Sequence, residues 1–159
     1  MMMLAFDVIR SLGERTLATA ESCTGGMIGA ALTAVPGASR VFRGGVISYT
    51  NEVKNRLLGV DAELLETHGA VSASVAEAMA RGARAVLKTD LAVSVTGLAG
   101  PGGDEFGNPV GTVFIGYADE NTVRAEEYHF TGDREAVRQQ AVQAALALIL
   151  RMCEKYKED

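Results

Sequence analysis

The residues best suited to chemistry lie together in the segment Glu21-Ser22-Cys23-Thr24-Gly25-Gly26, where a short β-type run gives way to a helix. Ser22 and Thr24 can cap that helix, and the two glycines leave its first turn open to a ligand. A serine hydroxyl at such a corner is a candidate nucleophile, because the free N–H groups of a helix start favour an oxyanion or a phosphate. The alternative is a capped turn in which the glycines serve only tight packing.

A serine nucleophile needs a base, and the chain has two histidines, His68 and His129. His68 falls at the end of a short helix and His129 within a strand, where structural roles are favoured over catalysis. Lys54, in the first turn after the second strand, is the better candidate, although a solvated surface lysine is the alternative. Partial burial or a nearby cation would ease the loss of its proton. Tyr49 could hydrogen-bond this pair or relay a proton, or simply end a strand.

Alternating and helical patterns of apolar residues predict the elements that must position these groups. Ser74 and Glu77 have the spacing of a capping box, which predicts the start of the longest internal helix. Helices alternate with strands in the first half and a hairpin follows, so we expect a three-layer α/β/α sandwich with a mixed sheet. The strands are expected over residues 16–20, 41–49, 91–95, 110–118 and 122–130, and the helices over 4–12, 27–35, 52–58, 62–68, about 74–90 and 133–156.

Three of the predicted strands end in polar or glycine-rich turns, namely Glu21-Ser22, Tyr49-Thr50-Asn51 and Thr96-Gly97. Ligands of open α/β sheets bind beyond the carboxyl ends of the strands, so we expect these turns to converge on one pocket. At the start of the last helix, Arg134 and Arg138 lie one turn apart. They could clamp a phosphate, or form a solvated pair that exchanges with nearby acids.

Composition limits the classes of protein that fit. The 159 residues, 48% hydrophobic and 22% charged, predict one globular domain over residues 1–159. A net charge of −5 without a basic cluster argues against nucleic-acid binding. Two distant cysteines favour a reducing cytoplasm, and no run resembles a signal peptide or a membrane span, so we expect a soluble cytoplasmic protein without a membrane partner. The oligomeric state stays open, and a homo-oligomer is compatible with the sequence.

No cofactor is expected. Asp104 and Glu105 lie in a loop without histidine or cysteine partners, which argues against a metal site. The chain contains neither a P-loop nor a GxGxxG motif in its required setting, so an NTPase or a dinucleotide oxidoreductase is disfavoured. The expected partner is therefore a small-molecule substrate.

Five segments of the chain together span nearly its whole length, namely residues Thr19–Gly26, Phe42–Lys54, Thr96–Gly103, Pro109–Val113 and Gly132–Arg134. In their order and spacing, these segments closely resemble the CinA C-terminal domain family. That family contains stand-alone nicotinamide-nucleotide amidases, which hydrolyse nicotinamide mononucleotide to nicotinic acid mononucleotide and ammonia. The resemblance implies this activity and this substrate here.

The resemblance also implies a Ser/Lys mechanism, with Ser22 as nucleophile, Lys54 as base and Tyr49 assisting. Arg138 resembles the phosphate contact of the family, with Arg134 as the other candidate, and backbone N–H groups near Ser22 or Gly97 would hold the oxyanion. The substrate-binding residues that the resemblance implies are Glu21, Thr24, Gly25, Thr96, Gly97, Ala99, Gly100, Arg134 and Arg138.

Two alternatives to this amidase remain at the level of sequence. One is a nucleotide-binding module of the same family that holds the ligand without turning it over. The other is a Ser/Lys hydrolase that acts on a different amide, such as a peptide. Release of ammonia from nicotinamide mononucleotide distinguishes the first alternative, and indifference to the phosphate would favour the second.

Overall fold

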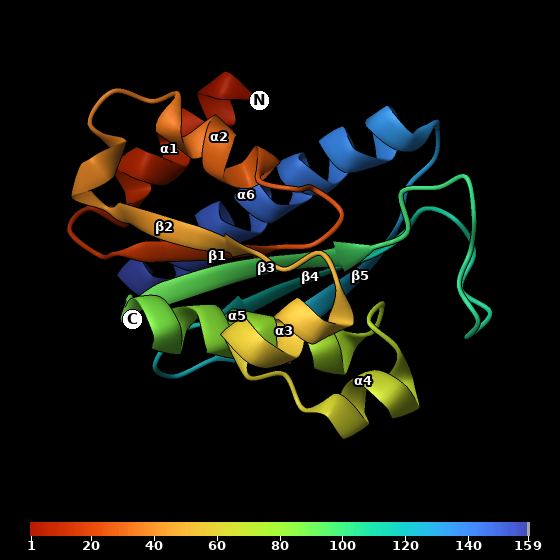
Figure 1. Ribbon diagram of the computed structural model, residues 1–159. Helices are drawn as coiled ribbons and strands as arrows, with labels where there is room; N and C mark the ends of the chain where they lie inside the picture. Colours follow the sequence, from red (N-terminus) through yellow and green to blue (C-terminus); the bar gives the residue numbers. More distant parts are fainter. Residues whose placement is uncertain (159) are drawn as a thin grey trace.

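The computed structural model describes residues 1–158 and contains a five-stranded mixed sheet (Figure 1). The strand order is β2-β1-β3-β4-β5. β1 pairs in parallel with both β2 and β3, whereas β3–β4 and β4–β5 are antiparallel. The strands are β1 (Leu17–Glu21), β2 (Phe42–Ile47), β3 (Leu91–Gly97), β4 (Thr112–Ala118) and β5 (Val123–His129).

Helices cover both faces of the sheet, which confirms the predicted α/β/α sandwich. In Figure 1, α1, α2 and α6 lie on one side of the strands, and α3, α4 and α5 lie on the other. A short 3-10 helix, η1 (Ala38–Arg40), precedes β2. The α-helices are α1 (Met2–Leu12), α2 (Met27–Thr33), α3 (Asn51–Leu58), α4 (Ala62–His68), α5 (Ala73–Leu87) and α6 (Arg134–Glu158). Within residues 1–158, no helix has both the length and the apolar character needed to span a bilayer.

The residues of the inner strands alternate between two buried clusters, as side chains of a strand must. On β1, Leu17 belongs to the cluster under α1, α2 and α6, whereas Ala18 and Ala20 belong to the cluster under α3, α4 and α5. Alanines on this second face let α5 pack closely against the sheet. A Cβ added at Gly82 of α5 would lie 2.0 Å from the carbonyl oxygen of Leu58, so α3 is in close contact with α5. This contact fixes the position of α3.

Most predicted boundaries differ from the structure by one to three residues, and two of these differences have a clear physical reason. β2 ends at Ile47 rather than at residue 49, because its partner β1 ends at Glu21. The N–H of Ser48 donates the last ladder bond, to the carbonyl of Glu21 (2.8 Å), and the chain then turns toward α3. The N-cap of α5 is Ser72, whose hydroxyl oxygen accepts from the N–H of Val75 (3.4 Å). The predicted capping box at Ser74 is therefore wrong, and its serine falls inside the first turn.

Candidate active site

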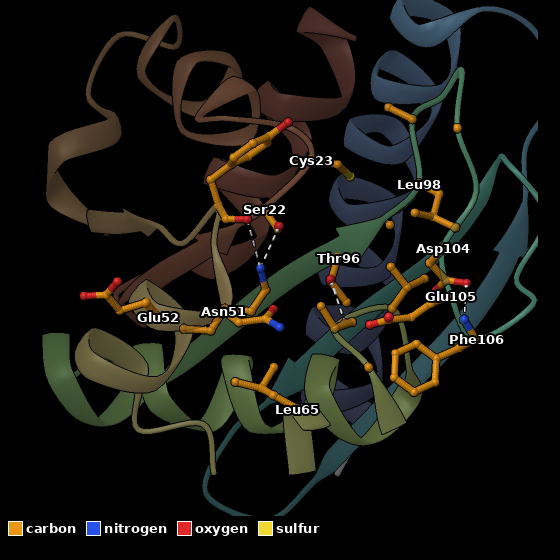
Figure 2. A pocket seen from close by; sticks show the side chains of 18 of the residues that line it. Ser22, Cys23, Asn51, Glu52, Leu65, Thr96, Leu98, Asp104, Glu105 and Phe106 are labelled. Carbon is orange, nitrogen blue, oxygen red and sulfur yellow. Dashed lines mark hydrogen bonds between the residues drawn. The ribbon is translucent and has the colours of Figure 1, made fainter. Parts of the chain in front are cut away.

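A cavity of about 950 Å³ lies where the carboxyl ends of β1, β2 and β3 meet, as the strand-end argument predicted (Figure 2). Its walls come from those strand ends, from α3 and α4, from the segment after β3 and from the start of α6. The residues that line it are Ser22, Cys23, Tyr49, Asn51, Glu52, Lys54, Asn55, Ala62, Leu65, Glu66, Gly69, Ala70, Val71, Thr96, Gly97, Leu98, Ala99, Gly100, Gly102, Asp104, Glu105, Phe106 and Arg134.

Ser22 and Lys54 meet at one side of this cavity. The Lys54 Nζ atom lies 2.9 Å from the Ser22 Oγ atom, a contact drawn as a dashed line in Figure 2. Ser22 follows the last residue of β1, and Lys54 stands in the first turn of α3. The hydroxyl oxygen of Thr50 caps that helix by accepting from the N–H of Val53 (3.3 Å). A helix start next to a strand end thus brings the amine to the hydroxyl.

Burial lowers the pKa of Lys54. Its side chain is 1% exposed, and the loss of hydration disfavours the charged ammonium, which brings the pKa to about 8. No carboxylate within residues 1–158 forms an ion pair with it. The neighbouring thiol of Cys23 is also buried, and burial raises its pKa to about 11, so Cys23 supplies no anion at neutral pH.

The remaining contacts of Lys54 suit a general base. Its Nζ atom donates to the carbonyl oxygens of Ser48 (2.7 Å) and Tyr49 (3.4 Å). A neutral amine has two N–H donors and one lone pair. When the donors are used on these carbonyls, the lone pair is left for the hydroxyl proton of Ser22. This arrangement can activate a serine nucleophile near neutral pH.

The corner around Ser22 is not capped as the sequence predicted. Gly26 is the N-cap of α2, and neither Ser22 nor Thr24 caps this helix. The carboxylate of Glu21 accepts instead from the N–H groups of Ile28 (2.9 Å) and Gly29 (3.0 Å). Negative charge is favoured at this end of a helix, where the N–H groups lack intrahelical partners.

The residues implied as substrate-binding divide into two groups. Thr96, Gly97, Ala99, Gly100 and Arg134 line the cavity. Glu21, Thr24, Gly25 and Arg138 do not line it. The hydroxyl of Thr24 donates to the Glu21 carboxylate (2.7 Å), and Arg138 donates to backbone carbonyls of the corner. The structure thus gives this second group contacts within the protein rather than toward the cavity.

The two arginines of α6 therefore differ. Arg134 donates to the carbonyl of Gly100 (2.6 Å) and to the hydroxyl of Tyr49 (3.1 Å), both on the cavity wall. Arg134 forms no ion pair within residues 1–158, whereas Arg138 lies 3.4 Å from a carboxylate oxygen of Glu135. A cation on the wall that contacts only neutral acceptors is available to an anionic ligand.

The other proposed participants lie apart from the Ser22–Lys54 pair. The hydroxyl of Tyr49 accepts a hydrogen bond from Arg134. Tyr49 contacts Lys54 only through its backbone carbonyl, which accepts from the Lys54 amine. His68 ends α4 and does not line the cavity. His129 also lies outside the lining, and its Nε2 atom is 2.6 Å from a carboxylate oxygen of Glu127.

Sequence reasoning missed the part of the cavity wall that α4 and the loop after β3 form. This part of the wall includes Leu65, Glu66 and Phe106. The Phe106 ring packs closely on Gly69, because a Cβ added at Gly69 would lie 2.6 Å from the ring. A weak signal existed, because the lining residues of α4 and of the turn after it recur at helical spacing. Within residues 1–158, His, Cys, Asp and Glu side chains do not gather into a group that could hold a metal ion.

Comparison with known proteins identifies the family of this chain and bears on its fold. The chain matches the CinA C-terminal domain over residues 4–153. It is 55% identical over 123 residues to a CinA-like protein of Geobacter sp. (strain M21). The aligned segment covers 77% of this chain and 30% of the relative. The chain thus spans about a third of the length of such curated relatives.

Solved structures match over nearly their whole length. A CinA superfamily protein from Klebsiella pneumoniae 700603 has a TM-score of 0.94 and 36% identity, covering 97% of this chain and 98% of that one. A competence/damage inducible protein from Agrobacterium tumefaciens has a TM-score of 0.91 and 39% identity, with coverages of 94% and 93%. The extent of the family match, together with these structures, establishes that the chain belongs to the CinA C-terminal domain family.

Proposed function

We propose that this chain is an amidohydrolase that converts nicotinamide mononucleotide to nicotinic acid mononucleotide and ammonia. The observation that carries the proposal is the Ser22–Lys54 pair, with a nucleophile 2.9 Å from a buried amine whose pKa is lowered to about 8. The substrate rests on the family resemblance and on the cavity, which is large enough for a mononucleotide. In this reading the chain serves the recycling of pyridine nucleotides.

The reaction proceeds through an acyl-enzyme. Ser22 Oγ bonds to the carboxamide carbon while its proton passes to the neutral amine of Lys54. The tetrahedral intermediate collapses as the C–N bond breaks, and the proton on Lys54 passes to the leaving nitrogen, which departs as ammonia. Water then attacks the ester carbon, gives its proton to Lys54, and Ser22 leaves as a hydroxyl after that proton is returned. The net change is hydrolysis of one amide bond.

The backbone offers a donor for the oxyanion. The N–H of Ser22 is already used, because it donates to the carbonyl of Val95 (2.9 Å). Alternate N–H groups of β3 point toward β1, and the register makes Gly97 the next donor beyond Val95. Its expected acceptor, the carbonyl of Ser22, bonds to the N–H of Gly25 (3.1 Å) instead. The Gly97 N–H thus lies beyond the last pair of β1 and β3, and we assign it to the oxyanion.

Arg134 is the candidate for the phosphate. Its guanidinium is a cation on the cavity wall next to the glycine-rich segment at Gly100. Because the nicotinamide ring has few polar handles, the phosphate and ribose would supply the binding energy that positions the amide. We expect Arg134→Met to raise the KM for nicotinamide mononucleotide about 10- to 100-fold, as loss of a charge-assisted contact does. The KM for nicotinamide riboside, which lacks the phosphate, should change little.

The decisive assay measures ammonia released from nicotinamide mononucleotide by the wild type, Ser22→Ala and Lys54→Met. We expect release by the wild type and a loss of at least 1,000-fold in Ser22→Ala, on the order reported for catalytic residues that act as a unit. Ser39→Ala, which changes an exposed serine outside the cavity, is the matched control and should retain activity. Tight binding of the nucleotide without release by the wild type would instead identify a nucleotide-binding module and end the amidase proposal.

A further inference from the structure

Two charged side chains hold the corner that carries Ser22, and neither lines the cavity. We propose that Glu21 and Arg138 are positioning residues, which clamp this corner to α2 and to α6 and so keep the Ser22 hydroxyl against the Lys54 amine. The inference rests on the proposed function for its kinetic test. It departs from the family resemblance, which implied that both residues contact the substrate.

Glu21 holds the corner to α2. Its side chain is 2% exposed, and its carboxylate accepts from the hydroxyl of Thr24 (2.7 Å) and from the N–H groups of Ile28 (2.9 Å) and Gly29 (3.0 Å). Both carboxylate oxygens are therefore used within the protein. Because Glu21 directly precedes Ser22 in the chain, these contacts fix the position of the nucleophile relative to α2.

Glu21 also connects the nucleophile to the base through its main chain. Its carbonyl accepts from the N–H of Ser48 (2.8 Å) at the end of β2. The carbonyl of Ser48 in turn accepts from the Lys54 amine (2.7 Å). A displacement of Glu21 would therefore be transmitted to both members of the pair.

Arg138 holds the same corner from α6. Its Nε atom donates to the carbonyl of Cys23 (3.0 Å), and its Nη2 atom donates to the carbonyl of Thr24 (3.4 Å). These are the two residues that follow Ser22. The planar guanidinium can bond adjacent carbonyls at once, which a lysine in its place could not do with the same geometry.

Misplacing a reacting group by about 1 Å can cost on the order of 100-fold in rate. Loss of either clamp should therefore lower kcat while leaving substrate affinity nearly unchanged. A phosphate contact has the opposite signature, because its loss raises KM and only for a substrate that carries the phosphate. The two roles can thus be separated by kinetics with two substrates.

The first experiment compares Arg138→Met with Arg134→Met, one helical turn away, on nicotinamide mononucleotide and nicotinamide riboside. We expect Arg138→Met to lower kcat about 10- to 100-fold by the same factor on both substrates, with KM within about twofold of the wild type. Arg134→Met should raise KM for the mononucleotide alone. A raised KM for the mononucleotide with normal turnover of the riboside in Arg138→Met would make Arg138 a phosphate contact and overturn the proposal.

The second experiment uses Glu21→Gln with Asp119→Asn as the matched control. Asp119 accepts from a hydroxyl and two N–H groups, those of Tyr117 (2.7 Å), Asn121 (2.8 Å) and Thr122 (2.7 Å), just as Glu21 does. It lies in the β4–β5 hairpin, at the opposite end of the sheet. We expect a fall in kcat only for Glu21→Gln. Equal kcat values in the two variants after correction for the folded fraction would contradict a positioning role.

A third readout does not depend on turnover. The chain has four lysines, Lys54, Lys88, Lys155 and Lys157, so the Lys54 side chain can be titrated by ¹³C NMR and assigned with Lys54→Met. Cys23 is the titratable side chain whose charge would affect the pKa of this amine. Its own pKa is raised to about 11, so the thiol stays protonated at neutral pH. We expect Glu21→Gln to loosen the corner, hydrate Lys54 and raise its midpoint toward 10.5.

Loss of a nearby negative charge alone would shift that midpoint downward, so the sign identifies the cause. An unchanged or lowered midpoint in Glu21→Gln would refute the clamp. If the wild type releases no ammonia, the proposed amidase activity fails, while this titration still decides whether Glu21 holds Lys54 in its buried position.

Discussion

The pH dependence of catalysis follows from the burial of Lys54. With a pKa of about 8, about one molecule in eleven has a neutral amine at pH 7, whereas an ordinary lysine at 10.5 would leave about one in three thousand. Burial therefore raises the population of active base by a factor of about 300 at neutral pH. Raising the pH from 7 to 9 should therefore increase the neutral fraction of the Lys54 amine about tenfold.

We expect kcat/KM for nicotinamide mononucleotide to rise about tenfold between pH 7 and pH 9, with a limb near pH 8, and then to level off. The measurement is ammonia release at substrate concentrations well below KM, from pH 7 to pH 9.5. This range lies above the second pKa of a phosphate, near 6, so the substrate charge stays constant. Lys54→Met should show residual activity without this limb.

Two results would refute the reasoning. A limb near pH 10 would mean that Lys54 is hydrated in solution and that burial does not activate it. A rate that is constant from pH 7 to pH 9.5 would mean that another group takes the proton of Ser22. The ¹³C titration of Lys54 separates these cases, because it reports the amine directly and not through turnover.

Further predictions concern stability. Between pH 7 and pH 9.5 the free energy of unfolding of the wild type should rise by about 2 kcal/mol relative to that of Lys54→Met. The reason is that the unfolded chain binds more protons at Lys54 than the folded chain does in this range. Denaturant unfolding of both proteins at the two pH values measures the difference. Gly82→Ala should destabilise by about 1–3 kcal/mol by crowding Leu58, whereas Gly102→Ala, with open space around it, should stay within about 0.5 kcal/mol. Thr50→Ala should cost about 1 kcal/mol through the lost cap of α3, measured by urea unfolding.

Much of the fold was predictable because its local signals agree. The strands read as apolar β-type runs, the helices have glycine or polar residues at their ends, and α3 and α4 end at the predicted residues. The meeting of Ser22 with Lys54 was also predictable, since β1 and β2 are parallel neighbours and their carboxyl ends lie at the same edge of the sheet. The 2.9 Å contact agrees with that expectation.

The sides on which Glu21 and Arg138 lie were not predicted, although one signal was present. Successive residues of a strand point to opposite faces, so Glu21 and Ser22 cannot both face α3. Ser22 contacts Lys54 of α3, and Glu21 contacts α2. For Arg138 no such rule applies, because residues one turn apart share a helix face. Which arginine reaches the cavity depends on how α6 crosses the sheet, and tertiary packing alone sets that.

The surroundings of Lys54 explain how one lysine can be buried and still serve as a base. An ion pair would offset the cost of burial, but it would also raise the pKa and keep the amine protonated. The structure uses three neutral oxygens instead, those of Ser22, Ser48 and Tyr49. These satisfy hydrogen bonds without adding a charge that holds the proton. The cost is a folded state that is about 3 kcal/mol less stable at pH 7 than with an unshifted lysine, which the buried clusters on the two faces of the sheet must outweigh.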